Sequence, residues 1–172
     1  MIPSIEIELG KICEVSSSKR IFANEYTKTG IPFYRSKEII EKHLGKKVTT
    51  ELYISKEKYS EIKNKYGTPY IGDILMSSVG TIGVTWFVDE EDFYFKDGNL
   101  TLLRPDNNLL DNKYLYLVLN SKEMQNQIQS FCIGTTQKAL TISNIKKLKV
   151  KLPSLDIPCR SRNFSVDDRE KE

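Results

Sequence analysis

The sequence predicts an α+β domain, a mixed α/β fold rich in strands, with peripheral helices and a long helix in its C-terminal half. Three observations support this class. Apolar and polar residues alternate over short stretches that Gly and Pro interrupt, which is typical of strands and turns. From about residue 111 the apolar spacing changes to the period of a helix. With 172 residues, 39% of them apolar, the chain suits one hydrophobic core.

The first forty residues predict three strands. Residues 5–9 alternate apolar with acidic side chains, and residues 11–15 repeat the pattern. Residues 16–20 form a polar loop with a basic tip. Residues 30–35 predict a turn that enters an edge strand, because the proline in it cannot donate to a central ladder. Residues 36–40 predict a short helix or a turn.

A helix is expected after residue 55. Ser55 is a suitable N-cap, and Gly67 is well placed to end the helix. Three apolar or aromatic side chains fall on one face of this helix: Tyr59, Ile62 and Tyr66.

The middle of the chain predicts paired strands. Residues 73–79 and 82–88 read as two strands joined by a Gly-Thr turn. Residues 93–95 and 99–103 predict a β-hairpin, because Asp97–Gly98 between them is a strong turn signal.

The C-terminal half predicts helices and one last strand. Residues 111–130 have helical spacing and predict one helix of about 20 residues or two abutting ones. A helix start at 141–145 leads to an alternating strand at 148–152. We therefore expect a domain over 1–155 and a disordered tail over 156–172.

Charge is distributed unevenly, although the net charge is only +3. Residues 1–66 and 106–152 each carry an excess of four positive charges, whereas residues 67–105 carry an excess of four negative charges. If the two basic segments fold together, they form a positive face. The alternative is ordinary solvated charge on helix surfaces.

Several classes of protein are not expected. No apolar run approaches the roughly 20 residues that span a bilayer, and the N-terminus lacks the features of a secretion signal. The three cysteines form no CxxC pair, so we expect neither disulfides nor zinc, and a cytoplasmic location. The sequence contains no GxG or GxxxxGK[ST] motif, and no Asp precedes residue 73. His43 lies in a polar stretch without an evident partner, so we expect no enzyme activity and no cofactor.

Three groups of segments, in this order, carry a family resemblance. They are Gly30–Ile39, then Gly72–Gly83 with Leu100–Pro105, then Tyr114–Ser121, Gly134–Leu140 and Leu148–Leu155. Together they resemble a target recognition domain of a type I restriction–modification specificity subunit (HsdS), over roughly residues 5–155.

The resemblance implies a non-catalytic domain that reads one half of a bipartite site in double-stranded DNA. It also implies partners that perform the chemistry, namely the methyltransferase (modification) subunits and the restriction subunit. A full subunit has two such domains separated by long helices. Here one domain is present, and Pro158 stops any helix after it, so we expect a truncated or frame-shifted form that could pair with a second half-subunit.

The residues expected to contact DNA are cations, hydroxyls and an amide in or near polar loops. They are Lys19, Arg20, Tyr34, Arg35, Lys37, Ser77, Ser78, Thr81, Thr135, Thr136, Gln137 and Lys138. Arg35 is favoured for a forked contact with guanine or phosphate, and the alternative is an ion pair with Glu38. Tyr34 could pack on a sugar or belong to the core.

Two of the polar segments have structural alternatives. Residues 77–81 could present backbone N–H groups to a phosphate, or form a plain hairpin turn. Residues 134–138 could bind an anion beside the following helix start, or simply cap that helix. For the whole chain, the alternative function is a protein-interaction module that docks on a methyltransferase subunit through the 114–128 helix and has lost useful DNA binding.

Overall fold

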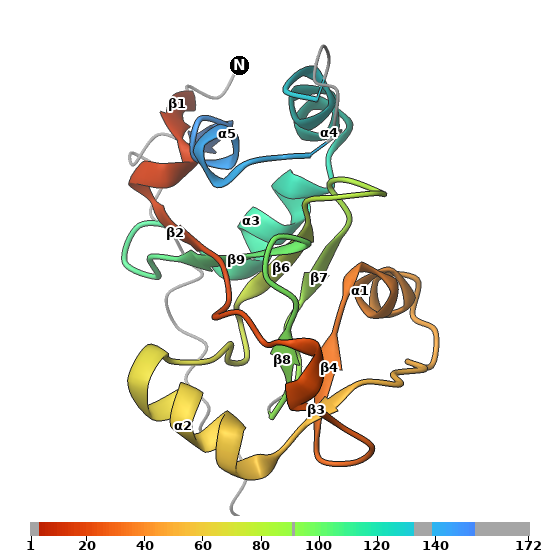
Figure 1. The fold of residues 1–172 in the computed structure, drawn as a ribbon. Helices are drawn as coiled ribbons and strands as arrows, with labels where there is room; N and C mark the ends of the chain where they lie inside the picture. Colours follow the sequence, from red (N-terminus) through yellow and green to blue (C-terminus); the bar gives the residue numbers. More distant parts are fainter. Residues whose placement is uncertain (1–3, 91, 133–138, 154–172) are drawn as a thin grey trace, which may run out of the picture.

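The computed structural model describes residues 4–90, 92–132 and 139–153. It confirms a mixed fold of helices and sheets (Figure 1). The elements in chain order are β1 Ser4–Glu8, η1 Leu9–Lys11, β2 Cys13–Ser16, η2 Ala23–Glu25, β3 Tyr26–Thr27, β4 Ile31–Tyr34, α1 Ser36–His43, β5 Tyr53–Ile54, α2 Lys56–Tyr66, β6 Ile74–Ser77, β7 Thr85–Phe87, β8 Tyr94–Phe95, β9 Leu100–Pro105, α3 Asn112–Leu119, α4 Lys122–Ser130, α5 Ile142–Lys146 and β10 Lys149–Pro153.

The strands form three sheets. The central sheet has the order β2-β9-β6-β7 with antiparallel neighbours, and a second sheet has the order β3-β5-β4-β8. The third is the antiparallel pair β1-β10, which joins the two ends of the described chain. All four residues of β6 are buried, because this inner strand has neighbours on both sides and side chains packed on both faces.

Apolar side chains gather into three clusters that follow this layout. The largest packs α3, α4 and α5 against one face of the central sheet and includes Leu103, Leu115 and Ile128. A second, with Trp86 and Phe93, lies on the other face, where α1 contacts β7. The third packs α2 against the second sheet, at the lower end of the molecule in Figure 1.

The predicted helix boundaries are confirmed where a side chain caps a helix. The Ser55 hydroxyl accepts the Lys58 N–H at 3.1 Å, and Gly67 ends α2 at φ +77°. The long C-terminal helix is divided into α3 and α4, because the Ser121 hydroxyl accepts the Met124 N–H and starts a new helix. On the predicted face of α2, Tyr59 and Ile62 are buried, whereas Tyr66 is 51% exposed.

The prediction of a β-hairpin over residues 93–103 was wrong, because its two strands do not pair with each other. Asp97 and Gly98 do form a turn, in which the Leu100 N–H donates to the Lys96 carbonyl at 3.2 Å. The strands on either side of this turn then diverge into different sheets. β8 pairs in parallel with β4, whereas β9 lies between β2 and β6 in the central sheet.

The alternating strand at the end of the domain is confirmed as β10. Val150 is buried, while Lys149 and Lys151 face solvent and form ion pairs with Glu8 at 3.0 Å and Glu123 at 2.6 Å. These lysines are therefore neutralised locally. No helix among the described residues combines the length and apolar composition needed to span a membrane. The predicted tail, 156–172, lies outside the described residues.

Candidate nucleic-acid interface

The parallel pairing of β4 and β8 places two basic residues side by side. Phe33 pairs with Tyr94 and Tyr34 with Phe95, and the Lys96 N–H donates to the Tyr34 carbonyl at 2.8 Å. Arg35 and Lys96 therefore follow directly after two neighbouring strands that end at the same edge of the sheet. Both side chains are about one third exposed.

The basic loop that follows β2 is held against the same edge. The Ser18 hydroxyl donates to the Phe95 carbonyl at 2.7 Å, and the Lys19 N–H donates to the Tyr94 hydroxyl at 2.7 Å. Arg20 Nε donates to Asp97 Oδ2 at 2.9 Å, while the Arg20 side chain stays 67% exposed. The fold thus brings the main chain of Lys19 and the side chain of Arg20 to the strand ends from which Arg35 emerges, while the Lys19 ammonium lies over the Tyr66 ring.

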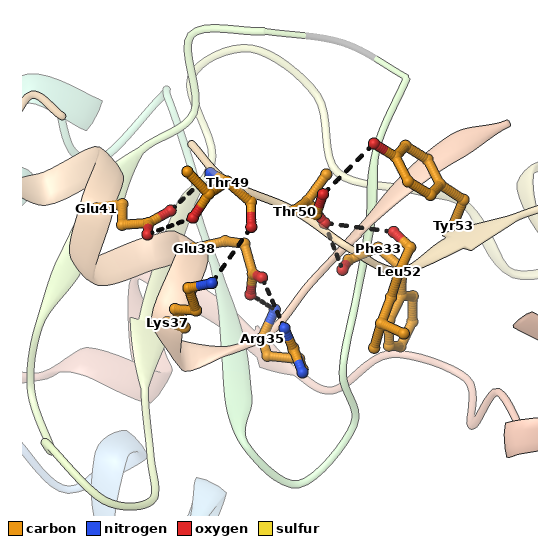
Figure 2. Close-up of polar contacts among 9 residues, drawn as sticks. All are labelled: Phe33, Arg35, Lys37, Glu38, Glu41, Thr49, Thr50, Leu52 and Tyr53. Carbon is orange, nitrogen blue, oxygen red and sulfur yellow. Dashed lines mark hydrogen bonds and ion pairs between the residues drawn. The ribbon is translucent and has the colours of Figure 1, made fainter. Parts of the chain in front are cut away.

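A buried carboxylate holds the Arg35 guanidinium (Figure 2). Glu38 Oε1 accepts Arg35 Nη2 at 3.0 Å, and Glu38 Oε2 accepts the Arg35 N–H at 2.8 Å. Glu38 is fully buried in the first turn of α1. Its hydrogen bond raises the pKa of Arg35 further above its usual value, so the guanidinium stays charged. The ion pair that the sequence offered as an alternative is therefore present.

The segment before β5 is tied to α1 beside this pair (Figure 2). The Glu41 carboxylate accepts the Thr49 N–H at 2.9 Å and the Thr49 hydroxyl at 2.8 Å. Lys37 Nζ, which is exposed, donates to the Thr49 carbonyl at 3.3 Å. These bonds hold the segment around Thr49 against the face of α1 that carries Lys37 and Glu41.

We call this group of cations the basic edge, and its members are Lys19, Arg20, Arg35, Lys37 and Lys96. Four carboxylates lie among or beside them. Glu38 is buried and the Asp97 side chain is 12% exposed, whereas Glu41, which binds Thr49, and Glu51, whose charge acts on Arg35, reach solvent. The five cations outnumber the two carboxylates that reach solvent. The charge that reaches solvent at the basic edge is therefore mainly positive. Such a surface attracts polyanions and orients them before contact.

Tyr34, in contrast, belongs to the core. Its ring stacks on Phe93 with centroids 5.1 Å apart and meets Trp86 edge-on at 6.1 Å. Its hydroxyl donates to Glu90 at 2.6 Å, and Glu90 also accepts Lys42 at 2.6 Å. Burial, together with the Glu90 carboxylate, raises the pKa of Tyr34. The packing therefore supports the interpretation of Tyr34 as a core residue and not as a residue that packs on a sugar.

Ser77 and Ser78 are also buried, and their hydroxyls are used inside the protein. The Ser77 hydroxyl donates to the Thr81 carbonyl at 2.5 Å and accepts the Val84 N–H at 3.0 Å. The Ser78 hydroxyl pairs with that of Thr101 at 2.7 Å. They shape the turn, as the hairpin alternative required, and the part of it that reaches solvent is Val79–Thr81.

The remaining candidates, Thr135, Thr136, Gln137 and Lys138, lie outside the described residues. The residue that follows them can be placed. Ala139 forms a bridge with Val79, and the Leu140 N–H donates to the Ser78 carbonyl at 2.8 Å. The exposed turn and the start of this last segment are therefore neighbours in space.

A family model for the type I restriction modification DNA specificity domain matches residues 4–158 of this chain. The chain belongs to this family. Among curated proteins, this specificity domain is 39% identical over 150 residues to a Haemophilus influenzae protein named as a type I restriction enzyme specificity subunit. That match covers 87% of the chain and 36% of the relative, so the chain spans about a third of the relative's length.

Solved structures show the same fold at low sequence identity. The specificity domain matches the HsdS subunit of Thermoanaerobacter tengcongensis with a TM-score of 0.59 and 18% identity, over 87% of this chain and 33% of that one. It matches a specificity subunit of M. genitalium with a TM-score of 0.59 and 18% identity, over 88% of this chain and 34% of that one. A chain in a structure of a type I restriction–modification system matches with a TM-score of 0.62 and 19% identity. That match covers 89% of this chain and 35% of that one.

Lys96, one member of the basic edge, was not identified from the sequence as a candidate DNA contact. Lys96 follows β8, and its position beside Arg35 depends on the parallel pairing of β8 with β4. The hairpin expected for residues 93–103 placed it elsewhere. No local pattern around Lys96 predicts this pairing, because β4 and β8 lie far apart in the chain.

Groups that could do chemistry are sparse in the described part of the specificity domain. Within it, no cluster of three or more His, Cys, Asp or Glu residues could hold a metal ion. His43 is exposed, as expected, and its Nδ1 lies 2.8 Å from the Thr85 carbonyl. Burial raises the pKa of the Cys13 thiol to about 12, so it stays protonated.

Proposed function

We propose that this specificity domain binds double-stranded DNA and reads one short half of a bipartite site, without catalysis of its own. The observation that carries the proposal is the convergence of Lys19, Arg20 and Arg35 at the shared end of β4 and β8. Membership of a DNA specificity family supports it.

The basic edge offers both kinds of contact that a DNA reader needs. Exposed cations such as Arg20 and Lys37 suit phosphates, which position a protein on the duplex but carry no sequence information. Arg35 differs from them, because Glu38 fixes its guanidinium through one nitrogen, Nη2. A held, permanently charged fork suits the two acceptors of guanine in the major groove. Arg35 is therefore our candidate for base readout.

The other predicted contacts divide by their location. Thr81, which is exposed, and Thr135, Thr136, Gln137 and Lys138 remain in the proposal as a second contact region beyond the basic edge. Tyr34, Ser77 and Ser78 do not, because their side chains are buried and already bonded.

The partners follow from the family and are part of the proposal. We infer that the domain directs methyltransferase subunits and a restriction subunit to its site, and that a second specificity half reads the other part of the site. We expect it to act in the cytoplasm, where the DNA of the cell is, and to need no cofactor.

Selection from a randomised duplex library, eluted across a salt series, tests the proposal. We expect an enriched motif of a few base pairs, bound at least ~10³-fold more tightly than other DNA. Arg35→Ala is expected to cost about 1–3 kcal/mol and to relax the preference at one position. Arg20→Gln is expected to weaken binding to all sequences and to reduce the salt dependence.

The matched control removes a charge elsewhere. Lys147→Gln alters an exposed lysine after α5, at the other end of the molecule from the second sheet in Figure 1, and is expected to bind like the wild type. Salt-sensitive binding with no enriched motif would overturn sequence reading. The basic edge would then be only a basic surface, and docking on a methyltransferase subunit through the 114–128 helix would become the leading hypothesis.

A further inference from the structure

A hollow lies next to the basic edge and contains groups that the proposed function does not use. Its lining comes from β2 and the loop after it, the end of α2 with the residues that follow it, and strands β8 and β9. The lining residues with charged or aromatic side chains that matter here are Glu14, Lys19, Tyr66 and Arg104. Lys19 belongs both to this hollow and to the basic edge, so the two surfaces are continuous.

Tyr66, the last residue of α2, is the distinctive side chain of this hollow. The residue is 51% exposed, whereas Tyr59 and Ile62 on the same face of α2 are buried. Two ammonium groups approach the Tyr66 ring, Lys19 Nζ at 5.3 Å from the centroid and Lys65 Nζ also at 5.3 Å. We call these three residues the Tyr66 site.

Lys19 and Lys65 differ from Lys58 and Lys63, two lysines of α2 that lie near carboxylates. Lys58 pairs with Glu25 at 3.0 Å, and Lys63 lies 3.9 Å from Asp92. Within the part of the chain that the structure describes, neither Lys19 nor Lys65 forms an ion pair. Each ammonium group lies 5.3 Å from the centroid of the Tyr66 ring, so an anion that approaches this ring is attracted by both charges.

The hollow lacks the groups that read base edges. Its lining contains no Asn or Gln, and its guanidinium, that of Arg104, is already bound by Asp73 through two hydrogen bonds of 2.9 and 2.7 Å. The other charged groups of the lining are the Glu14 carboxylate and the Lys19 ammonium, and Lys65 adds a second ammonium beside Tyr66 from outside the lining. Cations beside an apolar ring fit a phosphate chain with sugars between its charges.

We propose that the Tyr66 site is a second contact for the DNA backbone, which extends the footprint of the basic edge along the duplex. The ring of Tyr66 packs on a deoxyribose, and the ammonium groups of Lys65 and Lys19 neutralise phosphates on that strand, which recur every ~3.4 Å of helix axis. This assignment rests on the proposed DNA binding and adds a sequence-independent contact to it.

The test measures binding of the full 172-residue chain to two duplexes across a salt series. One duplex carries the motif enriched by the selection, and the other has an unrelated mixed sequence. Lys65→Gln is expected to weaken binding to both duplexes by the same factor, about threefold to tenfold, and to lower the salt slope by about 0.9. Tyr66→Ala is expected to weaken both in a similar way, while Tyr66→Phe, which keeps the ring, binds like the wild type.

The control is Lys56→Gln, which removes the same charge from the first turn of α2, about 13.5 Å away along the helix. If Lys65→Gln and Lys56→Gln have the same affinity and salt slope, the Tyr66 site is not a backbone contact, although DNA binding itself stands. A loss confined to the motif duplex would also overturn the assignment, because it would indicate base readout. If the wild-type chain binds neither duplex, the proposed function fails and the inference fails with it.

Discussion

The side-chain amide of Gln127 pairs with both main-chain groups of Lys149. Gln127 Nε2 donates to the Lys149 carbonyl at 3.1 Å, and Gln127 Oε1 accepts the Lys149 N–H at 2.9 Å. On the same strand, the Tyr114 hydroxyl donates to the Lys151 carbonyl at 2.7 Å. Side chains of α3 and α4 thus occupy backbone groups of β10 that β1 does not pair, and an open edge is a site for unwanted strand pairing.

Gln127→Ala is therefore expected to destabilise the protein by about 1 kcal/mol, because two main-chain groups lose their partner and water replaces it only in part. Urea denaturation measures the change. Gln129→Ala is the control, since Gln129 is exposed on the same helix. Equal midpoints for the two variants would show that the Gln127 pairing adds nothing to stability.

Glu38→Gln is expected to weaken both folding and DNA binding. Removing the charge leaves the guanidinium of Arg35 without its buried carboxylate, at a cost of about 1–3 kcal/mol in stability. The guanidinium then loses its fixed orientation, so the affinity for the enriched motif should fall more than the affinity for unrelated DNA. Glu61→Gln, on the exposed face of α2, serves as the control in both measurements. A uniform loss on all duplexes would assign Arg35 to a phosphate instead of a base.

Gly83 and Gly80 provide a matched pair in the turn between β6 and β7. Both have positive φ, +85° and +79°, so alanine strains the backbone at either position by about 1–2 kcal/mol. At Gly83 a Cβ would also lie 2.9 Å from Gln125 Oε1 and 3.2 Å from Ile128 Cγ2, whereas at Gly80 it would meet nothing within 4 Å. Gly83→Ala is expected to cost about 1–3 kcal/mol more than Gly80→Ala in thermal or urea unfolding. Equal costs would mean that the side chains of Gln125 and Ile128 move aside at little cost.

The Cys13 thiol predicts a loss of stability at alkaline pH. Its pKa is raised from 9.0 to about 12, mainly by burial. Above about pH 9 the unfolded chain releases this proton while the folded chain keeps it, so the unfolded state binds fewer protons and stability falls as pH rises. The urea midpoint, followed from about pH 8 to 10.5, should therefore fall more steeply in the wild type than in Cys13→Ala. Parallel curves for the two proteins would contradict this.

The sequence by itself determined the local features of the protein. Ser55 and Ser121 start helices because a hydroxyl next to free N–H groups satisfies them wherever the helix packs. The alternation of β10 placed Val150 inside and its flanking lysines outside, because successive strand residues face opposite sides. The family resemblance was likewise readable from ordered segments of the sequence and is now shown by the match over residues 4–158.

Only the tertiary structure decided which segments meet. The Asp97–Gly98 turn forms as its sequence predicts, yet β8 pairs with β4 and not with β9. A turn signal fixes a few dihedral angles, whereas strand pairing is chosen by the burial of whole faces between distant segments. The packing of distant segments also decides that Ser77 is buried and that Tyr66 is exposed. Residue type and period describe a side chain's local surroundings, and its access to a ligand depends on what the rest of the chain packs against it.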